Sequence, residues 1–197
     1  MNKILTIDQG TTSSRSIIFD QNGDIQDLAQ QEYPLIYPND GWVEIEPHVL
    51  MNSVEQTLNN INLDEVAGIG ITNQRETTLV WDRETGEPIY NAIVWQDRRT
   101  AEYCSSINDE AIKDTINKKT GLLLDPYFSA TKIRWILDKI PNAQTRAEAG
   151  ELCFGTVDTY LMYKLSKGEI FKTDITNASR TMLFDIHKLE WDDELLS

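Results

Sequence analysis

The stretch that decides the fold of this chain is Leu5-Thr6-Ile7-Asp8-Gln9-Gly10-Thr11-Thr12-Ser13-Ser14-Arg15, followed by Ser16-Ile17-Ile18-Phe19-Asp20. An apolar run ends in the carboxylate of Asp8, turns through Gly10 and a row of hydroxyl residues, and returns as a second apolar run. This pattern predicts a β-hairpin over residues 3–8 and 15–20. Its tip offers backbone N–H groups and hydroxyls to a phosphate, and Asp8 suits the metal that accompanies phosphates. An ordinary hairpin with a polar turn is the alternative interpretation.

Composition limits the classes of protein to which the chain can belong. Its 197 residues are 40% apolar and 25% charged, with a net charge of −14. No stretch approaches the roughly 18 apolar residues of a membrane-spanning helix. The acidic balance argues against nucleic acid or an anionic membrane surface as a partner. Cys104 and Cys153 lack metal-ligand spacing, so we expect a cytoplasmic, disulfide-free protein.

Signals along the chain predict a mixed α/β fold. Asn22-Gly23 marks a turn before a third antiparallel strand over residues 25–33, and the apolar residues 66–72 predict a buried strand. The other predicted elements are a helix over 48–60, strands over 77–81 and 89–95, and helices over 129–139 and 156–166. This order indicates a sheet with antiparallel strands beside a parallel part, flanked by helices. The G-x-x-x-x-G-K-[ST] motif of P-loop proteins is absent from the sequence.

A second polar cluster, Asn73-Gln74-Arg75-Glu76-Thr77, follows the apolar run of the fourth predicted strand. If the backbone turns there, Arg75 and Glu76 converge on one small ligand. Glutamate accepts hydrogen bonds from hydroxyls, whereas arginine donates and stays charged. The pair therefore suits adjacent hydroxyls of a polyol, and a solvated hairpin tip is the alternative.

Two aromatic residues could complete such a site. Trp95 ends an apolar strand, where it either belongs to the core or forms a pocket wall for the carbon side of a polyol. Tyr127 precedes a predicted helix, where it either packs half-buried or gives its hydroxyl to a ligand.

The polar clusters follow one another in a fixed order, which is Asp8-Gln9-Gly10-Thr11-Thr12-Ser13-Ser14-Arg15, Asn73-Gln74-Arg75-Glu76-Thr77, Trp95-Gln96-Asp97-Arg98-Arg99, Asp125-Pro126-Tyr127-Phe128-Ser129, Phe154-Gly155-Thr156-Val157-Asp158-Thr159 and Thr176-Asn177-Ala178-Ser179-Arg180-Thr181. In this order they resemble the glycerol kinases of the FGGY carbohydrate kinase family. The resemblance runs from near residue 4 to the last residue. It implies an α/β fold of the ribonuclease-H-like, actin-like ATPase class, with residues 1–197 as an N-terminal FGGY kinase domain.

The resemblance also implies ATP-dependent phosphorylation of glycerol to sn-glycerol 3-phosphate, with Mg²⁺. It assigns the substrate site to residues of the later motifs, which are Arg75, Glu76, Trp95 and Tyr127. It assigns the nucleotide phosphates to residues of the hairpin, which are Thr11, Thr12, Ser13 and Arg15, and the metal to Asp8.

Members of this family have a second domain, and the resemblance implies that the catalytic base, an aspartate, lies beyond Ser197. We therefore expect the chain to be an N-terminal fragment that is inactive alone. We expect the full-length protein to be a homo-oligomer that binds glycerol and ATP or ADP. The alternatives are a kinase of another polyol or sugar in the same family, and a non-catalytic actin-like nucleotide-binding module.

Overall fold

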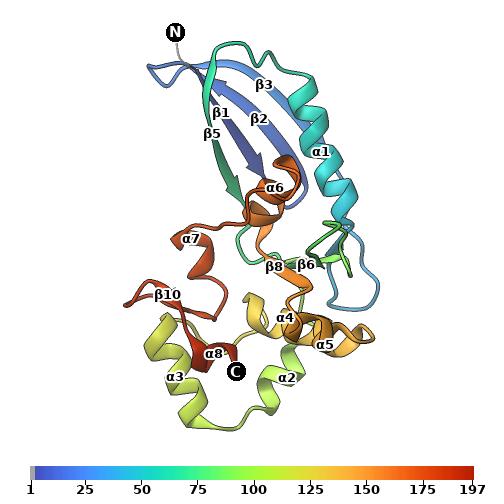
Figure 1. Ribbon diagram of the computed structural model, residues 1–197, viewed down its shortest axis with the longest axis vertical. Helices are drawn as coiled ribbons and strands as arrows, with labels where there is room; N and C mark the ends of the chain where they lie inside the picture. Colours follow the sequence, from blue (N-terminus) through green and yellow to red (C-terminus); the bar gives the residue numbers. More distant parts are fainter. Residues whose placement is uncertain (1–2) are drawn as a thin grey trace. The chain divides into compact units, whose positions relative to one another are not determined.

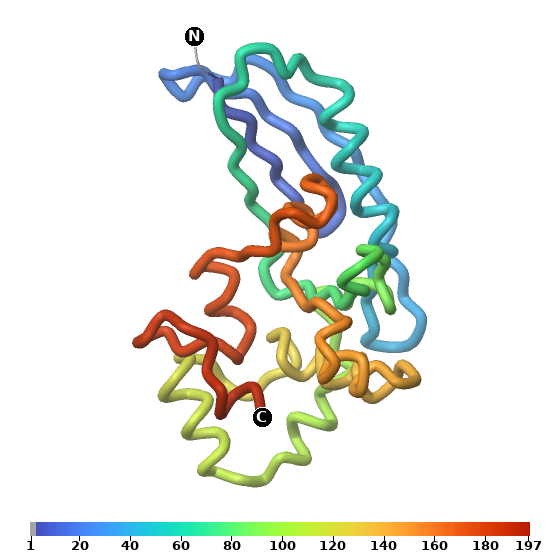
Figure 2. Tube along the Cα trace, viewed as in Figure 1, coloured from blue at the N-terminus to red at the C-terminus, as the bar shows by residue number. Residues whose placement is uncertain are grey.

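The structure, a computed structural model, describes residues 3–197. The chain divides into two compact units. The first contains the chain up to Ile36 together with Ile45–Gln74, and the second contains Tyr37–Glu44 together with Arg75–Ser197. Figures 1 and 2 trace the chain through both units.

A four-stranded mixed sheet forms the first unit, with strand order β3-β2-β1-β5. Its strands are β1 (Lys3–Gln9), β2 (Ser13–Phe19), β3 (Ile25–Glu32) and β5 (Val66–Asn73). β1 pairs antiparallel with β2, β2 antiparallel with β3, and β1 parallel with β5. The predicted hairpin, third strand and mixed sheet are therefore confirmed. Gly23, at a φ of 86°, makes the turn between β2 and β3, as the Asn-Gly signal predicted.

Helix α1 (Pro47–Asn59) covers one face of this sheet along β2 and β3 (Figure 1). Hydroxyl pairs join it to β2: the oxygens of Ser14 and Ser53 lie 2.7 Å apart, and those of Ser16 and Thr57 also lie 2.7 Å apart. Because these side chains are small and buried, the helix approaches the strand closely while each hydroxyl keeps a partner. Because side chains alternate along a strand, Asp8 lies on the sheet face opposite to the one that α1 covers.

The expectation that residues 66–72 form a buried strand is wrong for this chain. They form β5, whose one strand partner within residues 3–197 is β1. Ile69 is 63% exposed, and Ala67 and Gly70 are also exposed. An apolar run reports composition, whereas burial depends on which elements cover the strand.

The second unit is built from short elements, with β4 (Glu44–Ile45) on the boundary between the units. They are β6 (Leu79–Asp82), β7 (Ala92–Ile93), α2 (Ala101–Ser106), α3 (Glu110–Thr120), α4 (Ser129–Lys139), α5 (Ala143–Glu148), β8 (Leu152–Gly155), α6 (Val157–Leu165), α7 (Ile175–Ala178), β9 (Phe184–Asp185), β10 (Glu190–Trp191) and α8 (Asp193–Leu196). The predicted helices over 129–139 and 156–166 are confirmed as α4 and α6. Within residues 3–197, no helix has the length and apolar character needed to cross a bilayer.

The predicted strand over 89–95 is shorter in the structure, where β7 contains Ala92–Ile93. Residues 78–81 meet residues 88–93 through isolated bridges, Thr78 with Ile93 and Trp81 with Pro88. The ladder of β6 runs to β8, which comes much later in the chain. The strand partner of β6 is therefore set by tertiary contacts that local signals do not reveal.

Candidate functional site

The tip of the β1–β2 hairpin is a tight turn. The N–H of Gly10 donates to the carbonyl of Ser13 at 2.9 Å, and a Cβ on Gly10 would lie only 3.2 Å from that oxygen. Thr12 is exposed and Thr11 half-buried, whereas Ser13 is 6% exposed. Of the predicted phosphate-binding hydroxyls, those of the two threonines are therefore the more accessible.

Asp8 and Arg15 lie opposite each other on β1 and β2. Nη1 of Arg15 donates to Oδ2 of Asp8 at 3.0 Å, and both side chains are partly exposed. The structure thus joins the predicted metal ligand and the predicted phosphate ligand to each other. Residues 3–197 contain no group of three acidic, histidine or cysteine side chains that could hold a metal. A single carboxylate nonetheless fits Mg²⁺, because this ion is commonly held by one or two carboxylates together with substrate phosphates.

A buried polar network that the sequence did not predict supports the backbone of the hairpin tip at Gly10. The Tyr33 hydroxyl donates to the carbonyl of Gly10, and accepts from Gln9 at 2.5 Å and from Gln74 at 3.2 Å. Gln74 also donates to the side chain of Gln9 and to Gly10, at 3.0 Å each. Burial raises the pKa of Tyr33 to about 12, so its hydroxyl stays protonated and able to donate. Leu5, Ile7 and Gln9 are buried at every second position of β1. This alternation is the one local sign that the Gln9 side chain belongs to the buried network.

In the second unit, Glu76 is 4% exposed and its carboxylate is held by Arg180. Nε of Arg180 donates to Oε1 of Glu76 at 2.7 Å across 104 residues of sequence. Arg180 belongs to the last of the motifs quoted above, and its sequence surroundings assign it no role. Only the position of that motif in the family order could have indicated it, because Arg180 follows α7 in an otherwise unremarkable polar loop.

The two predicted aromatic residues meet beside this ion pair. The rings of Trp95 and Tyr127 pack edge to face with centroids 5.7 Å apart. The guanidinium of Arg180 lies 5.9 Å from the centre of the Tyr127 ring. The hydroxyl of Thr77 accepts from the N–H of Trp95 at 3.2 Å, which ties Trp95 to the segment that carries Glu76. Glu76, Trp95 and Tyr127 are therefore brought together with Arg180, and we refer to these four residues as the Glu76 cluster.

Arg75 lies in a different environment from its neighbour. It is exposed, while Glu76 is buried. Within residues 3–197, the Arg75 guanidinium forms no ion pair, which leaves its donors accessible to a ligand.

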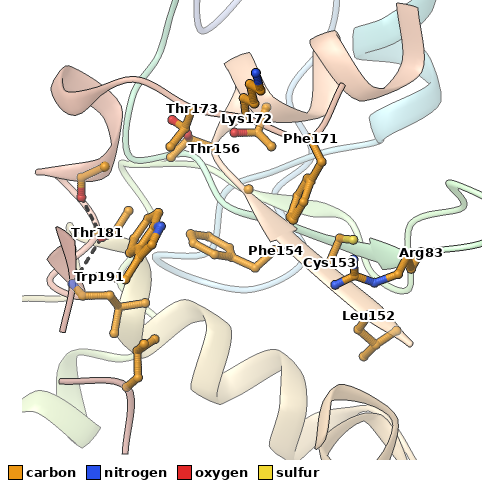
Figure 3. Close-up of a pocket in the computed structure, with 15 residues that line it drawn as sticks. Arg83, Leu152, Cys153, Phe154, Thr156, Phe171, Lys172, Thr173, Thr181 and Trp191 are labelled. Carbon is orange, nitrogen blue, oxygen red and sulfur yellow. Dashed lines mark hydrogen bonds between the residues drawn. The ribbon is translucent and has the colours of Figure 1, made fainter. Parts of the chain in front are cut away.

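A cavity of about 310 Å³ also lies in the second unit (Figure 3). The aromatic rings of Phe154, Phe171 and Trp191 and the hydroxyls of Thr156 and Thr181 line it. None of the residues of the Glu76 cluster contributes to its walls. This cavity and the predicted polyol site are therefore different places.

Comparison with known proteins agrees with the motif order. Residues 3–197 match the model of the FGGY family of carbohydrate kinases, N-terminal domain. The chain is 60% identical to a glycerol kinase of Alteromonas mediterranea, over 98% of this chain and 41% of that protein. It is 57% identical to a glycerol kinase of Janthinobacterium sp., over 98% of this chain and 40% of that protein. The chain thus spans about 40% of the length of the relatives it matches.

Solved structures extend this similarity to the fold. The crystal structure of Plasmodium falciparum glycerol kinase with ADP is 37% identical and has a TM-score of 0.89, covering 99% of this chain and 40% of that one. A xylulose kinase from Lactobacillus acidophilus, at 23% identity, has a TM-score of 0.85 over 100% of this chain and 39% of its own, and shows the fold alone. The predicted actin-like ATPase fold is confirmed. The chain therefore belongs to the FGGY family of carbohydrate kinases, whose N-terminal domain model it matches from residue 3 to residue 197.

Proposed function

We propose that the full-length protein containing this chain transfers the γ-phosphoryl group of ATP to glycerol and forms sn-glycerol 3-phosphate. The observation that carries the proposal is the Glu76 cluster, a buried carboxylate oriented by Arg180 beside the Trp95–Tyr127 aromatic pair. A nucleotide switch without a polyol substrate has no need of this arrangement. The names of the relatives at 55–60% identity support glycerol as the polyol.

Each residue of the cluster has a distinct role in the proposed glycerol complex. The Glu76 carboxylate accepts a hydrogen bond from a glycerol hydroxyl, because Arg180 uses Oε1 and a carboxylate has about four acceptor positions. The exposed Arg75 guanidinium donates to hydroxyl oxygens, and so does the Tyr127 hydroxyl. Trp95 packs against the carbon side of the ligand. The ligand is thus held by both donors and acceptors, which restricts its orientation.

The hairpin would bind the phosphates. Thr11, Thr12 and Ser13 offer hydroxyl and backbone N–H donors, and Arg15 offers a permanent positive charge. Asp8 would hold Mg²⁺ together with the phosphates, and the ion when bound neutralises charge on the transferring group. Arg15 would then exchange part of its pairing with Asp8 for a phosphate oxygen. Phosphoryl transfer depends mainly on such positioning and charge neutralisation.

The proposal is tested on the full-length protein by a coupled assay with glycerol and ATP. Arg75→Ala is expected to raise the KM for glycerol by about tenfold or more, because a hydrogen bond from a charged group contributes about 1.5–3 kcal/mol. The KM for ATP is expected to stay within about twofold of the wild-type value, a change of less than roughly 0.5 kcal/mol. Arg134→Ala is a matched control, because Arg134 pairs with Asp138 on its own helix.

Other outcomes would contradict parts of the proposal. An unchanged KM for glycerol in Arg75→Ala removes Arg75 from the site. A panel of polyols and sugars tests the substrate, and faster phosphorylation of another member identifies a different kinase of this family. ATP binding without phosphorylation of any member, measured by calorimetry, indicates a non-catalytic nucleotide-binding module.

A further inference from the structure

A buried lysine lies directly behind the Glu76 cluster. Lys132 belongs to helix α4 and is 1% exposed, although lysine is almost never fully buried without a specific partner. Its Nζ donates to the main-chain carbonyl of Tyr127 at 2.8 Å and to the main-chain carbonyl of Glu76 at 3.1 Å. One side chain therefore joins two segments that lie 51 positions apart in the sequence, from residue 76 to residue 127.

The charges around Lys132 do not by themselves explain its burial. Carboxylates of Asp97, Glu76 and Asp125 favour its charged form, while Arg99 disfavours it. Burial outweighs these effects and lowers the pKa of Lys132 to about 7. Burying an amine costs desolvation free energy, so its burial here calls for a reason beyond these charges.

The main-chain contacts supply that reason. The Glu76 carboxylate is oriented by Arg180, but Arg180 holds only the end of the side chain. The backbone carbonyl of residue 76 accepts a hydrogen bond from Lys132, and so does that of Tyr127. Lys132 therefore links the two segments directly through their main chain.

We propose that Lys132 is a positioning residue of the glycerol site, which sets the separation of Glu76 and Tyr127 by holding the backbone of both. This inference rests on the proposed function, because it assigns the purpose of the contact to the ligand between those residues. Lys132 itself does not touch glycerol. A displacement of about 1 Å at a binding group can cost roughly a hundredfold in activity. A hydrogen bond that holds the main chain of a binding residue can therefore have a large effect on activity.

The test uses the full-length protein and compares the KM for glycerol with the KM for ATP. Lys132→Met keeps most of the length of the unbranched side chain and removes its donors. It is expected to raise the KM for glycerol by about tenfold or more, while the KM for ATP stays within about twofold. Lys132→Arg keeps donors at the end of the side chain and is expected to lie closer to wild type than Lys132→Met. Lys139→Met, at an exposed lysine of the same helix, is the matched control and is expected to change neither KM.

Each result separates the positioning role from a merely structural one. An unchanged KM for glycerol in Lys132→Met overturns the proposal, and so does an equal rise of both KM values. If Lys132→Met yields no folded protein, Lys132→Gln replaces it, because its shorter amide reaches fewer carbonyls and is expected to show the same selective rise. A wild-type protein without glycerol kinase activity overturns the proposed function first, which distinguishes that failure from failure of the Lys132 role alone.

Discussion

Adjacent residues in this chain have opposite environments where the proposed chemistry takes place. Glu76 is buried and paired with Arg180, while Arg75 is exposed. A buried carboxylate needs a partner, and the partner orients it before a ligand arrives. The exposed arginine stays available to donate. The expectation that both residues bind one polyol stays a prediction, and the structure indicates that Glu76 is the one already held in place.

The titration of Lys132 gives a measurable signature at the residue scale. Its pKa of about 7 in the folded chain lies below the ordinary lysine value of 10.5, so between these values the unfolded chain binds more protons. The free energy of unfolding contributed by this group therefore rises with pH, by at most about 1.4 kcal/mol per pH unit. In urea unfolding from pH 7 to pH 9, wild type should gain stability relative to Lys132→Met. Equal slopes for the two proteins would show that Lys132 is not desolvated.

Removal of the hydroxyl is expected to change the stability in opposite directions at two tyrosines of α6. The hydroxyl of Tyr160 is buried and has no hydrogen-bond partner within residues 3–197. The hydroxyl of Tyr163 donates to the carbonyl of Arg83. Tyr160→Phe should leave the stability unchanged or raise it by about 1 kcal/mol, and Tyr163→Phe should lower it by about 1 kcal/mol. Thermal unfolding of both variants checks this, and destabilisation by Tyr160→Phe would reveal a partner for that hydroxyl.

At the scale of elements, the β1–β2 hairpin was predictable because alternation and turn chemistry are local. The support of its tip was not, because Tyr33 and Gln74 reach Gly10 from other parts of the chain. The same limit explains the shortened strand β7. The strand β6 takes its ladder partner, β8, from a later part of the chain. Elements with a local periodicity, such as α4, kept their predicted bounds.

The Tyr33 network predicts a selective effect on the nucleotide. Tyr33→Phe leaves the amides of Gln9 and Gln74 and the carbonyl of Gly10 with one partner fewer in a buried place, at a cost of about 1–3 kcal/mol. In the full-length protein we expect a higher KM for ATP and an unchanged KM for glycerol. Tyr37→Phe, at a tyrosine that is 67% exposed, is the control. A rise in the KM for glycerol alone would contradict a role in the phosphate hairpin.

At the scale of the whole molecule, the features assigned to the two substrates belong to different compact units. The phosphate hairpin lies in the first, and the Glu76 cluster lies in the second. Phosphoryl transfer requires both substrates to be held in line, so neither unit suffices. The single domain predicted over 1–197 stays a prediction.

The 197-residue chain by itself is therefore expected to phosphorylate no glycerol in the coupled assay. It spans about 40% of the length of the relatives it matches, so most of the length of a glycerol kinase is absent from the assayed chain. The full-length protein in the same assay is the control. Turnover by the isolated chain at an ordinary enzymatic rate of about 1 s⁻¹ or more would contradict this expectation.

The sequence by itself determined the hairpin, the helices with strong periodicity, the mixed sheet and the family, because these follow from local patterns and from the order of motifs. Only the tertiary structure decided the pairing of Glu76 with Arg180, the contacts of Lys132 and the exposure of β5. Local patterns fix the conformation of neighbouring residues. Contacts across 50 or more residues depend on how whole elements pack, and a side chain's burial is set by the elements that cover it.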